Sequence, residues 1–429
     1  MVSGGAYGTE EIVHGAGYGR ALIILLVTPL LWSLPTALML GELSSALPHE
    51  GGYYAWVRRA LGDFWGFQEA WLSLVASIFD MAIYPTLFLA YLTRLVPWFQ
   101  TGYRGILVGL TVITVCVVLN VLGIRVVGAT SLWRFFLLSL PFAILVAVAP
   151  FRQELASLPP APSASTVGIV GGLLIAMWNY MGWDNASTIA VEVEQPQRTY
   201  PRALLASVLI VGLSYILPVA AMSFTGVSPS EWETGSWADL GAKVVGPWLG
   251  VAIVLGGMMS AFGMFNALVM SYSRLPLAMA QDGMLPGVFG RLHPRTRTPW
   301  VSIVVLAAGW ACCLGLGFER LVTIDILIYG AALALEFVAL LVLRFTEPRL
   351  KRPFSVPGGK LGAVLVGIGP LFLLGFSVLH SEREQILGMS GLAFGLLLIG
   401  AGVVAFGLRM VVQRLGWLPQ PARARQETE

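Results

Sequence analysis

Long apolar stretches fill most of this chain and constrain its fold more than any other feature. A helix that crosses the hydrocarbon core of a bilayer needs about 20 predominantly apolar residues. Stretches near that length predict about eleven membrane spans, close to residues 21–46, 67–97, 105–122, 127–150, 166–191, 203–225, 245–279, 300–317, 321–345, 361–380 and 386–410. The chain is therefore predicted to be an all-α integral membrane protein without a separate soluble domain.

The composition excludes several classes of protein. Charged residues make up 11% of the chain and hydrophobic residues 57%, whereas a soluble domain carries about 25% charged residues. The chain lacks the charged surface that a water-soluble enzyme, a secreted module or a nucleic-acid-binding protein needs. Its three cysteines lie inside apolar stretches, so they do not indicate a disulfide framework.

The basic residues predict the orientation in the membrane, because cytoplasmic loops carry an excess of Lys and Arg. If the loop after residues 21–46 is cytoplasmic, most of the 26 basic residues fall on the cytoplasmic side, including those in residues 290–298 and 344–360. We therefore expect a multi-pass protein of the cell membrane with a cytoplasmic C-terminus. The polar residues 411–429 are expected to be a disordered cytoplasmic tail.

Two glycine-rich segments interrupt the apolar pattern. Residues 179–188 read NYMGWDNAST in the middle of a span, and residues 3–8 read SGGAYG before Glu10 and Glu11. Gly182 is predicted to break its helix, which leaves backbone groups in need of polar partners. A pair of interrupted helices at matching places in two halves is typical of inverted-repeat transporters. The alternative is a glycine kink that serves packing alone.

Four blocks of sequence resemble the amino acid–polyamine–organocation (APC) superfamily of transporters. Within it, the resemblance is to the branch of plant-type polyamine uptake and L-type amino acid permeases. The blocks are SGGAYGTEEIV, WSLPTALMLGELSSALPHEGGYYAWVRRALGDFWGFQEAW, NYMGWDNASTIAVEVEQPQRTYPRAL and SRLPLAMAQDGMLPGVFGRLHPRTRTPW.

The resemblance implies a single transporter domain over residues 1–410 that works by alternating access. It implies a five-plus-five inverted repeat of the LeuT type, over about 1–150 and 166–345, with two further helices over 361–410. By this comparison the first helix is present only from its unwound break onward, and residues 10–18 form its outer half. We expect the missing half to be encoded upstream of Met1.

Acids, aromatic residues and glycines near the two breaks are the predicted substrate-binding residues. They are Ser3, Gly4, Gly5, Glu10, Asp80, Tyr84, Asn179, Tyr180, Gly182, Trp183, Asp184 and Asn185. Carboxylates beside aromatic rings suit a substrate with ammonium groups. The N–H groups of Ser3, Gly4 and Gly5 would instead suit the carboxylate of an amino acid. Both interpretations stay open, with a preference for an amine-bearing cation.

Four further acids in or near the spans have structural interpretations as well. Glu42 and Glu69 flank the first cytoplasmic loop and are expected to cap or pair with loop groups. Asp325 lies near the outer end of its span, where solvent would reach it. Glu336 precedes Arg344 by two helical turns, so the two are expected to form an ion pair.

The coupling ion is predicted less directly. Some proton-coupled relatives carry a lysine on the fifth helix, and the matching position near Leu138 holds none. The candidates for carrying a proton are therefore Glu10, Asp80, Asp184 and His14. A proton gradient is expected to drive uptake, sodium is a second option, and the sequence indicates no cofactor or metal.

These patterns predict a secondary active transporter for amino acids or polyamines. The alternatives are an exchanger without a coupling ion and a ligand sensor with the same fold. A channel would need a continuous polar pore, and an enzyme would need a motif such as HExxH or a nucleotide-binding loop, which the sequence lacks. The expected partners are a small amine or amino acid and the lipid bilayer, with no nucleic acid, and a monomer is the expected state.

Overall fold

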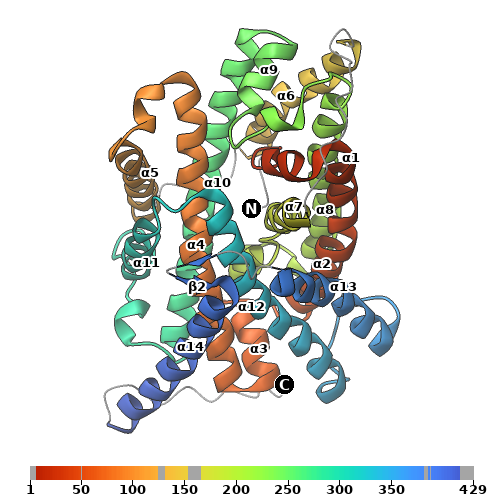
Figure 1. Ribbon diagram of the computed structural model, residues 1–429. Coiled ribbons are helices and arrows are strands. Elements are labelled where there is room, and N and C mark those ends of the chain that lie inside the picture. Colours follow the sequence, from red (N-terminus) through yellow and green to blue (C-terminus); the bar gives the residue numbers. More distant parts are fainter. Residues whose placement is uncertain are drawn as a thin grey trace.

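The computed structural model describes residues 6–49, 51–123, 131–152, 166–380, 385–386 and 388–415, and its architecture is helical (Figure 1). The α-helices are α1 (Glu10–Thr28), α2 (Leu34–Ala46), α3 (Tyr53–Leu61), α4 (Asp63–Leu95), α5 (Arg104–Val121), α6 (Ser131–Val148), α7 (Thr166–Asn179), α8 (Pro196–Met222), α9 (Trp237–Val244), α10 (Pro247–Gln281), α11 (Trp300–Cys312), α12 (Phe318–Thr346), α13 (Gly359–His380) and α14 (Gly391–Arg414). Two short strands, β1 (Gln385–Ile386) and β2 (Met389–Ser390), pair antiparallel before α14.

Eight helices of the described part are long and apolar enough to cross a membrane. They correspond to eight of the spans expected from sequence, and the continuous helix Glu10–Ala46 includes the expected span 21–46. The other three expected spans contain shorter helices, namely α6, α7 and α11. The short helices α3 and α9 lie between spans, where the apolar pattern did not predict them.

The first long helix changes direction at Gly17. This glycine has φ 73° and ψ 163°, outside the helical region, so it separates residues 10–16 from the rest of α1. The red ribbon of α1 bends there (Figure 1). A short helical segment before the span 21–46 was predicted, and the structure confirms it. A π-helical turn, Pro29–Ser33, then connects α1 to α2.

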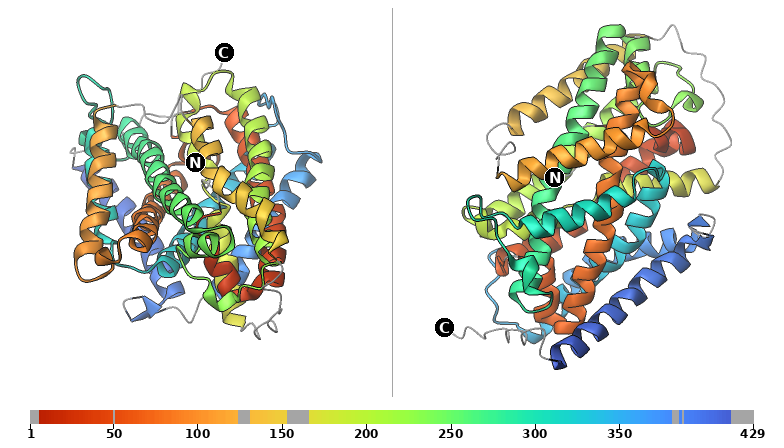
Figure 2. Two further views of the ribbon diagram at one scale, coloured as in Figure 1. Left: turned by 90° about the horizontal axis from the view of Figure 1, so that it is seen from above. Right: turned by 90° about the vertical axis from the view of Figure 1, so that its left-hand side faces the viewer.

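The core of the bundle lies around α4, α10 and α12. Helix α4 packs extensively against both α12 and α10, and α4 and α12 are the most buried of the long spans. By contrast, α14 runs along one edge of the bundle (Figure 2) and exposes large apolar side chains such as Leu396, Val404 and Leu408. Exposed apolar side chains on peripheral helices suit contact with lipid.

The two interrupted segments lie side by side because small residues let α1 approach α7. A Cβ atom added at Gly15 would lie 2.7 Å from the carbonyl oxygen of Gly168, and one added at Gly168 would lie 2.3 Å from that of Gly15. Small residues at such crossings allow close backbone packing in membrane bundles. This contact brings residues 6–16 against the helix that ends at the second break.

We expect Gly15→Ala to lower the stability of the protein by about 1–3 kcal/mol, because the added methyl group meets a backbone atom that cannot rotate away. Gly19→Ala is the matched control, since a Cβ atom there has nothing within 4 Å. The melting temperature of each variant in detergent measures the effect. Equal melting temperatures for the two variants would contradict the close-packing argument.

Candidate functional site

The helix break predicted at Gly182 is present. Helix α7 ends at Asn179, Gly182 has φ 85°, and a 3₁₀ helix, η5, covers Asp184–Glu192. Glycine adopts a positive φ without the steric cost that other residues carry. The break therefore depends on this residue, as the sequence indicated.

Neighbouring side chains satisfy the carbonyl groups that the break leaves open. The Tyr215 hydroxyl donates to the carbonyl of Asn179 at 2.9 Å, and Ser33 and Trp183 donate to the carbonyl of Tyr180 at 3.2 and 2.6 Å. The Asn179 amide in turn donates to the carbonyl of Gly8 at 3.1 Å, which joins the two glycine-rich segments. These hydrogen bonds stabilise the unwound backbone at the break.

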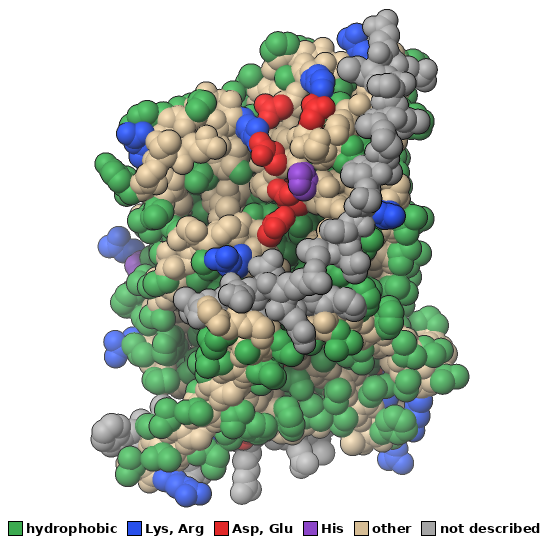
Figure 3. All heavy atoms as spheres, viewed as in Figure 1, with side chains coloured by type: hydrophobic (Ala, Val, Ile, Leu, Met, Phe, Trp, Pro, Cys, Tyr) green, Lys and Arg blue, Asp and Glu red, His purple; other side chains and the backbone are tan. Residues whose placement is uncertain are grey.

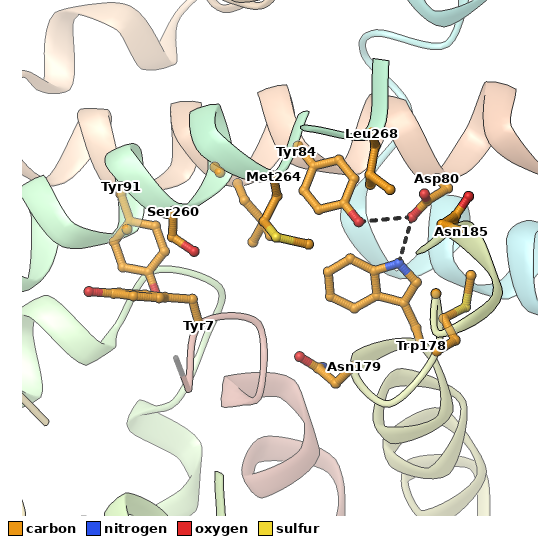
Figure 4. Close-up of a pocket in the computed structure, with 15 residues that line it drawn as sticks. Tyr7, Asp80, Tyr84, Tyr91, Trp178, Asn179, Asn185, Ser260, Met264 and Leu268 are labelled. Carbon is orange, nitrogen blue, oxygen red and sulfur yellow. Dashed lines mark hydrogen bonds between the residues drawn. The ribbon is translucent and has the colours of Figure 1, made fainter. Parts of the chain in front are cut away.

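A buried cavity lies beside this break, between α4, α10 and the segment that contains Tyr7 (Figure 4). Its walls are mostly aromatic and apolar, with a few polar groups, as in many sites for small ligands. The lining residues are Tyr7, Asp80, Tyr84, Leu87, Tyr91, Trp178, Asn179, Met181, Gly182, Asn185, Gly257, Ser260, Ala261, Met264 and Leu268.

Asp80 is the acidic residue of the cavity wall and is 3% exposed. One carboxylate oxygen accepts hydrogen bonds from the Trp178 indole at 3.1 Å and the Tyr84 hydroxyl at 3.3 Å. The other accepts from the Tyr272 hydroxyl at 3.0 Å. Figure 4 shows Tyr84 and Trp178 pointing at Asp80. Helices α4 and α10 and the end of α7 therefore position one carboxylate, and no Lys, Arg or His of the described residues forms an ion pair with it.

Tyr7 and Tyr91 form the opposite end of the cavity (Figure 4). Their rings meet edge to face at 5.2 Å, and the Tyr7 hydroxyl is buried without a hydrogen-bond partner in the described part of the chain. Ser260 on α10 lines the same cavity. These rings would offer cation–π contacts to a cationic ligand in the cavity.

Glu10 is fully buried, but its carboxylate is bound by surrounding groups and does not line the cavity. One oxygen accepts from the Tyr91 hydroxyl at 2.5 Å and from the Gly235 N–H at 3.0 Å. The other accepts from the Gly8 N–H at 2.7 Å. Glu10 therefore fixes the first break and positions Tyr91, which is itself a cavity residue.

The predicted site residues divide into four groups. Asp80, Tyr84, Asn179, Gly182 and Asn185 line the cavity together. Glu10, Tyr180, Trp183 and Asp184 are buried around it without lining it, and His14 is exposed. Ser3, Gly4 and Gly5 lie outside the described residues.

Asp184 and Asn185, at the start of η5, are held by other helices. The Tyr329 hydroxyl of α12 donates to Asp184 at 2.7 Å. The Ser271 hydroxyl of α10 donates to the carbonyl of Asn185 at 2.8 Å. The second broken segment is therefore tied to both α10 and α12.

Three expectations about other acids were wrong. Asp325 is fully buried, because its span packs deep in the bundle. Glu336 does not pair with Arg344, which instead binds Glu42. Glu69 accepts from Ser73 one turn along its own helix at 2.7 Å, and among the described residues its other oxygen has no hydrogen-bond partner in the loop. Glu42, by contrast, was correctly expected to bind loop groups, since it accepts from the Val356 N–H at 2.7 Å.

Several cavity residues were missed from the sequence. Tyr7 lies inside the first glycine-rich segment and Trp178 just before the second, so their positions beside the breaks were an available signal. Tyr91 follows Tyr84 by two turns of α4, which places the two on nearly one face. Tyr272 had no such signal, because only the packing of α10 against α4 brings it to Asp80.

A second, wider hollow is lined by charged residues, and we call it the Arg94 hollow. It is formed by Glu11, Ala90, Thr93, Arg94, Pro97, Gln100, Glu233, Thr234 and Asp239. Arg94 forms ion pairs with Glu233 at 2.7 Å and Asp239 at 2.6 Å. Acidic side chains gather on the same face below α9 in Figure 3. Nearby, Lys243 forms an ion pair with Glu231, and its hydrogen bond lowers the pKa of that carboxyl group.

The described part of the chain is a helical bundle with eight apolar spans, a broken helix and a cavity around one carboxylate. These features define a multi-pass membrane protein with a small-ligand site. The family model for amino acid permeases matches residues 1–404. The chain therefore belongs to the amino acid permease family, within the APC superfamily, and its members are transporters and not enzymes.

The relatives include transporters with different named substrates. The chain is 35% identical over 429 residues to the polyamine transporter RMV1 of Arabidopsis thaliana, covering 97% of this chain and 84% of the relative. It is 35% identical over 407 residues to the polyamine transporter PUT1 of Oryza sativa subsp. japonica, covering 92% and 75%. It is 25% identical over 374 residues to the serine/threonine exchanger SteT of Bacillus subtilis (strain 168), covering 84% of each chain.

Proposed function

We propose that this protein is a secondary active transporter that takes up a polyamine or a related amine cation by alternating access. The observation that carries the proposal is the Asp80 carboxylate, which is buried at the cavity wall among aromatic hydroxyl and indole donors. Such a site offers an ammonium group both charge and cation–π contacts. The relatives named as polyamine transporters support the same substrate class.

The proposed mechanism rests on a five-plus-five inverted repeat with one broken helix in each half. Gly8 and Gly182 both have φ 85°, and the hydrogen bond from Asn179 to Gly8 holds the two breaks together. In transporters of this type, the breaks surround the substrate and one bundle rocks against the other. The cavity lies between the breaks, so this rocking would change its shape.

The proposed orientation has the C-terminus in the cytoplasm and the protein in the cell membrane. The Arg94 hollow then faces outward, since it contains the loop after α4. Exposed acids at the entrance of a site raise the local concentration of cations. The lining of the hollow carries three acids, Glu11, Glu233 and Asp239, against one base, Arg94, and this excess of acids supports a cationic substrate. A monomer contains the whole proposed route.

An amino acid is the second candidate substrate, favoured by the similarity to a serine/threonine exchanger. In that case the N–H groups of Ser3, Gly4 and Gly5 would hold the substrate carboxylate. Asp80 would then bind the amino group. The two candidates differ in whether a free carboxylate on the ligand helps binding or weakens it.

We propose protons as the coupling ion, with sodium or ion-free exchange as the alternatives, and without any cofactor. Among the candidate residues Glu10, Asp80, Asp184 and His14, only Asp80 lines the cavity. A carboxylate that binds either the substrate or a proton would exchange the two in opposite directions. Proton-driven uptake therefore assigns the substrate to Asp80 and the proton to another of these residues. Glu10 holds backbone N–H groups, so its protonation would instead loosen the first break.

Uptake of labelled spermidine into proteoliposomes tests substrate and coupling together. We expect putrescine, spermidine and spermine to compete with the label, while serine and leucine do not. An acidic outside and alkaline inside should drive accumulation, and a protonophore should abolish it with sodium present or absent. Equal competition by serine would support the amino acid alternative. Accumulation that depends on internal substrate and survives the protonophore would indicate exchange.

A further inference from the structure

A row of buried carboxylates extends from the cavity into the bundle along α4 and α12. Besides Asp80 it contains Glu69 on α4, Asp184 on η5, and Asp325 and Glu336 on α12, each at most 3% exposed. Asp325 interacts electrostatically with Asp80 and Asp184, and Glu336 interacts with Asp184 and Glu69. Asp184 thus connects two carboxylate pairs, Asp80 with Asp325 at one end of the row and Glu69 with Glu336 at the other.

Each acid of α12 faces one of α4, Asp325 with Asp80 and Glu336 with Glu69, because the two helices run antiparallel. Glu69 precedes Asp80 on α4, whereas Glu336 follows Asp325 on α12, with the same separation in sequence. At the rise of an α-helix this separation corresponds to about 16 Å. The row is therefore longer than a single ammonium group or amino acid backbone requires.

The far pair, Glu69 and Glu336, is surrounded by polar groups without partners. Oε2 of Glu69, Oε2 of Glu336 and the Tyr53 hydroxyl are buried without a hydrogen bond among the described residues. Tyr53 is fully buried and lies in the electrostatic field of both glutamates. Buried polar groups normally have a hydrogen-bond partner, so several neighbouring groups without one indicate a missing ligand or proton.

The row carries no compensating charge from the protein itself. Within the described part of the chain, no Lys, Arg or His forms an ion pair with any of the five carboxylates. A buried unpaired charge is costly, so cations or protons must neutralise the row. No group of three or more described His, Cys, Asp or Glu side chains is placed to share one metal ion. A single organic cation that neutralises both ends of the row would carry its charges far apart.

We propose that Glu69, Glu336 and Tyr53 form a second ammonium site, which binds the far amine of an extended linear polyamine whose near amine lies on Asp80. An extended chain advances about 1.2 Å per bond, so terminal nitrogens ten to thirteen bonds apart are separated by about 12–16 Å. Spermine, with thirteen bonds between its terminal nitrogens, has this reach, whereas spermidine, with nine bonds and about 11 Å, and the short diamines do not. The inference rests on the proposed function, because it assumes that Asp80 binds an amine.

Binding of amines to the purified full-length protein tests the second site. In Glu69→Gln and Glu336→Gln, we expect spermine to bind 10- to 100-fold more weakly, while butylamine, putrescine and the shorter triamine spermidine bind as in the wild type. Glu347→Gln is the matched control, because that glutamate lies just beyond α12 and pairs with Arg59. An equal loss for all amines, or no loss for the long ones, would overturn the second site.

A ligand series on the wild-type protein tests the inference even if the variants fail to fold. Among α,ω-diamines of increasing length, affinity should rise steeply once the nitrogens are about 12 Å apart. Affinity that does not depend on length would overturn the second site but leave the proposed function in place. Failure of every amine to bind the wild type, the monoamine included, would contradict the proposed function itself.

Discussion

Replacing Asp80 by Asn is expected to abolish amine uptake while leaving the folded protein intact. The amide oxygen can still accept hydrogen bonds from Tyr84 and Trp178, and the amide NH2 group can donate to the Tyr272 hydroxyl oxygen, so the surrounding packing is retained. It removes the charge that the ammonium group needs. Truncating one partner of a buried charge pair costs about 2–5 kcal/mol, so affinity should fall by about 30-fold to several thousand-fold. Uptake and equilibrium binding of spermidine measure the loss.

Asp63→Asn is the matched control for this experiment. It makes the same chemical change on the same helix, but Asp63 is 45% exposed and pairs with Arg58 away from the cavity. We expect its uptake to stay near the wild-type level. If Asp80→Asn binds and transports spermidine as well as Asp63→Asn does, Asp80 is not the ammonium site. A large drop in melting temperature for Asp80→Asn alone would assign it a structural role.

Replacing Glu42 by Gln is expected to produce the largest loss of stability among single substitutions of charged residues. Glu42 is 1% exposed and binds Arg344, Arg352 at 3.1 Å and the Val356 N–H at 2.7 Å. It therefore ties the end of α2 to the loop after α12. Removing one partner of a buried ion pair costs about 3–5 kcal/mol, because the other charge stays buried. The melting temperature and the yield of monodisperse protein in detergent measure this loss.

Glu347→Gln provides the comparison for Glu42. That residue forms an ion pair with Arg59 near the surface, and the hydrogen bond from Arg59 lowers the pKa of Glu347. Exposed ion pairs contribute only about 0–1 kcal/mol. The control should therefore melt close to the wild type. If Glu42→Gln and Glu347→Gln have the same melting temperature, the network around Arg344 contributes little to stability.

The positions of the spans and of the second break followed from the sequence because their causes are local. Apolar runs at α4, α10 and α12 determine which segments enter the membrane. Gly182 was expected to interrupt its helix, and it has the positive φ that glycine tolerates. The separate segment before Gly17 was also expected. None of these features depends on a contact with a distant residue.

The partners of the buried acids could not be predicted, because they come from residues distant in sequence. Tyr272 lies far along the chain from Asp80 and reaches it only because α10 packs against α4. Asp325 was expected near solvent, but α12 is central and buries it completely. Spacing along one helix favoured Arg344 as the partner of Glu336, whereas the fold brings Arg344 to Glu42.

The sequence alone determined two features of this protein. Its low charge and long apolar stretches determined that the chain is a membrane bundle, and its two glycine-rich segments determined where the helices are interrupted. Both are local properties, since lipid selects apolar helices and glycine permits a break. Only the tertiary structure decided which acids meet which groups. It turned Glu10 toward backbone N–H groups and Asp80 toward the cavity. The physical reason is that a carboxylate buried in a bundle takes its partners from whichever helices pack around it.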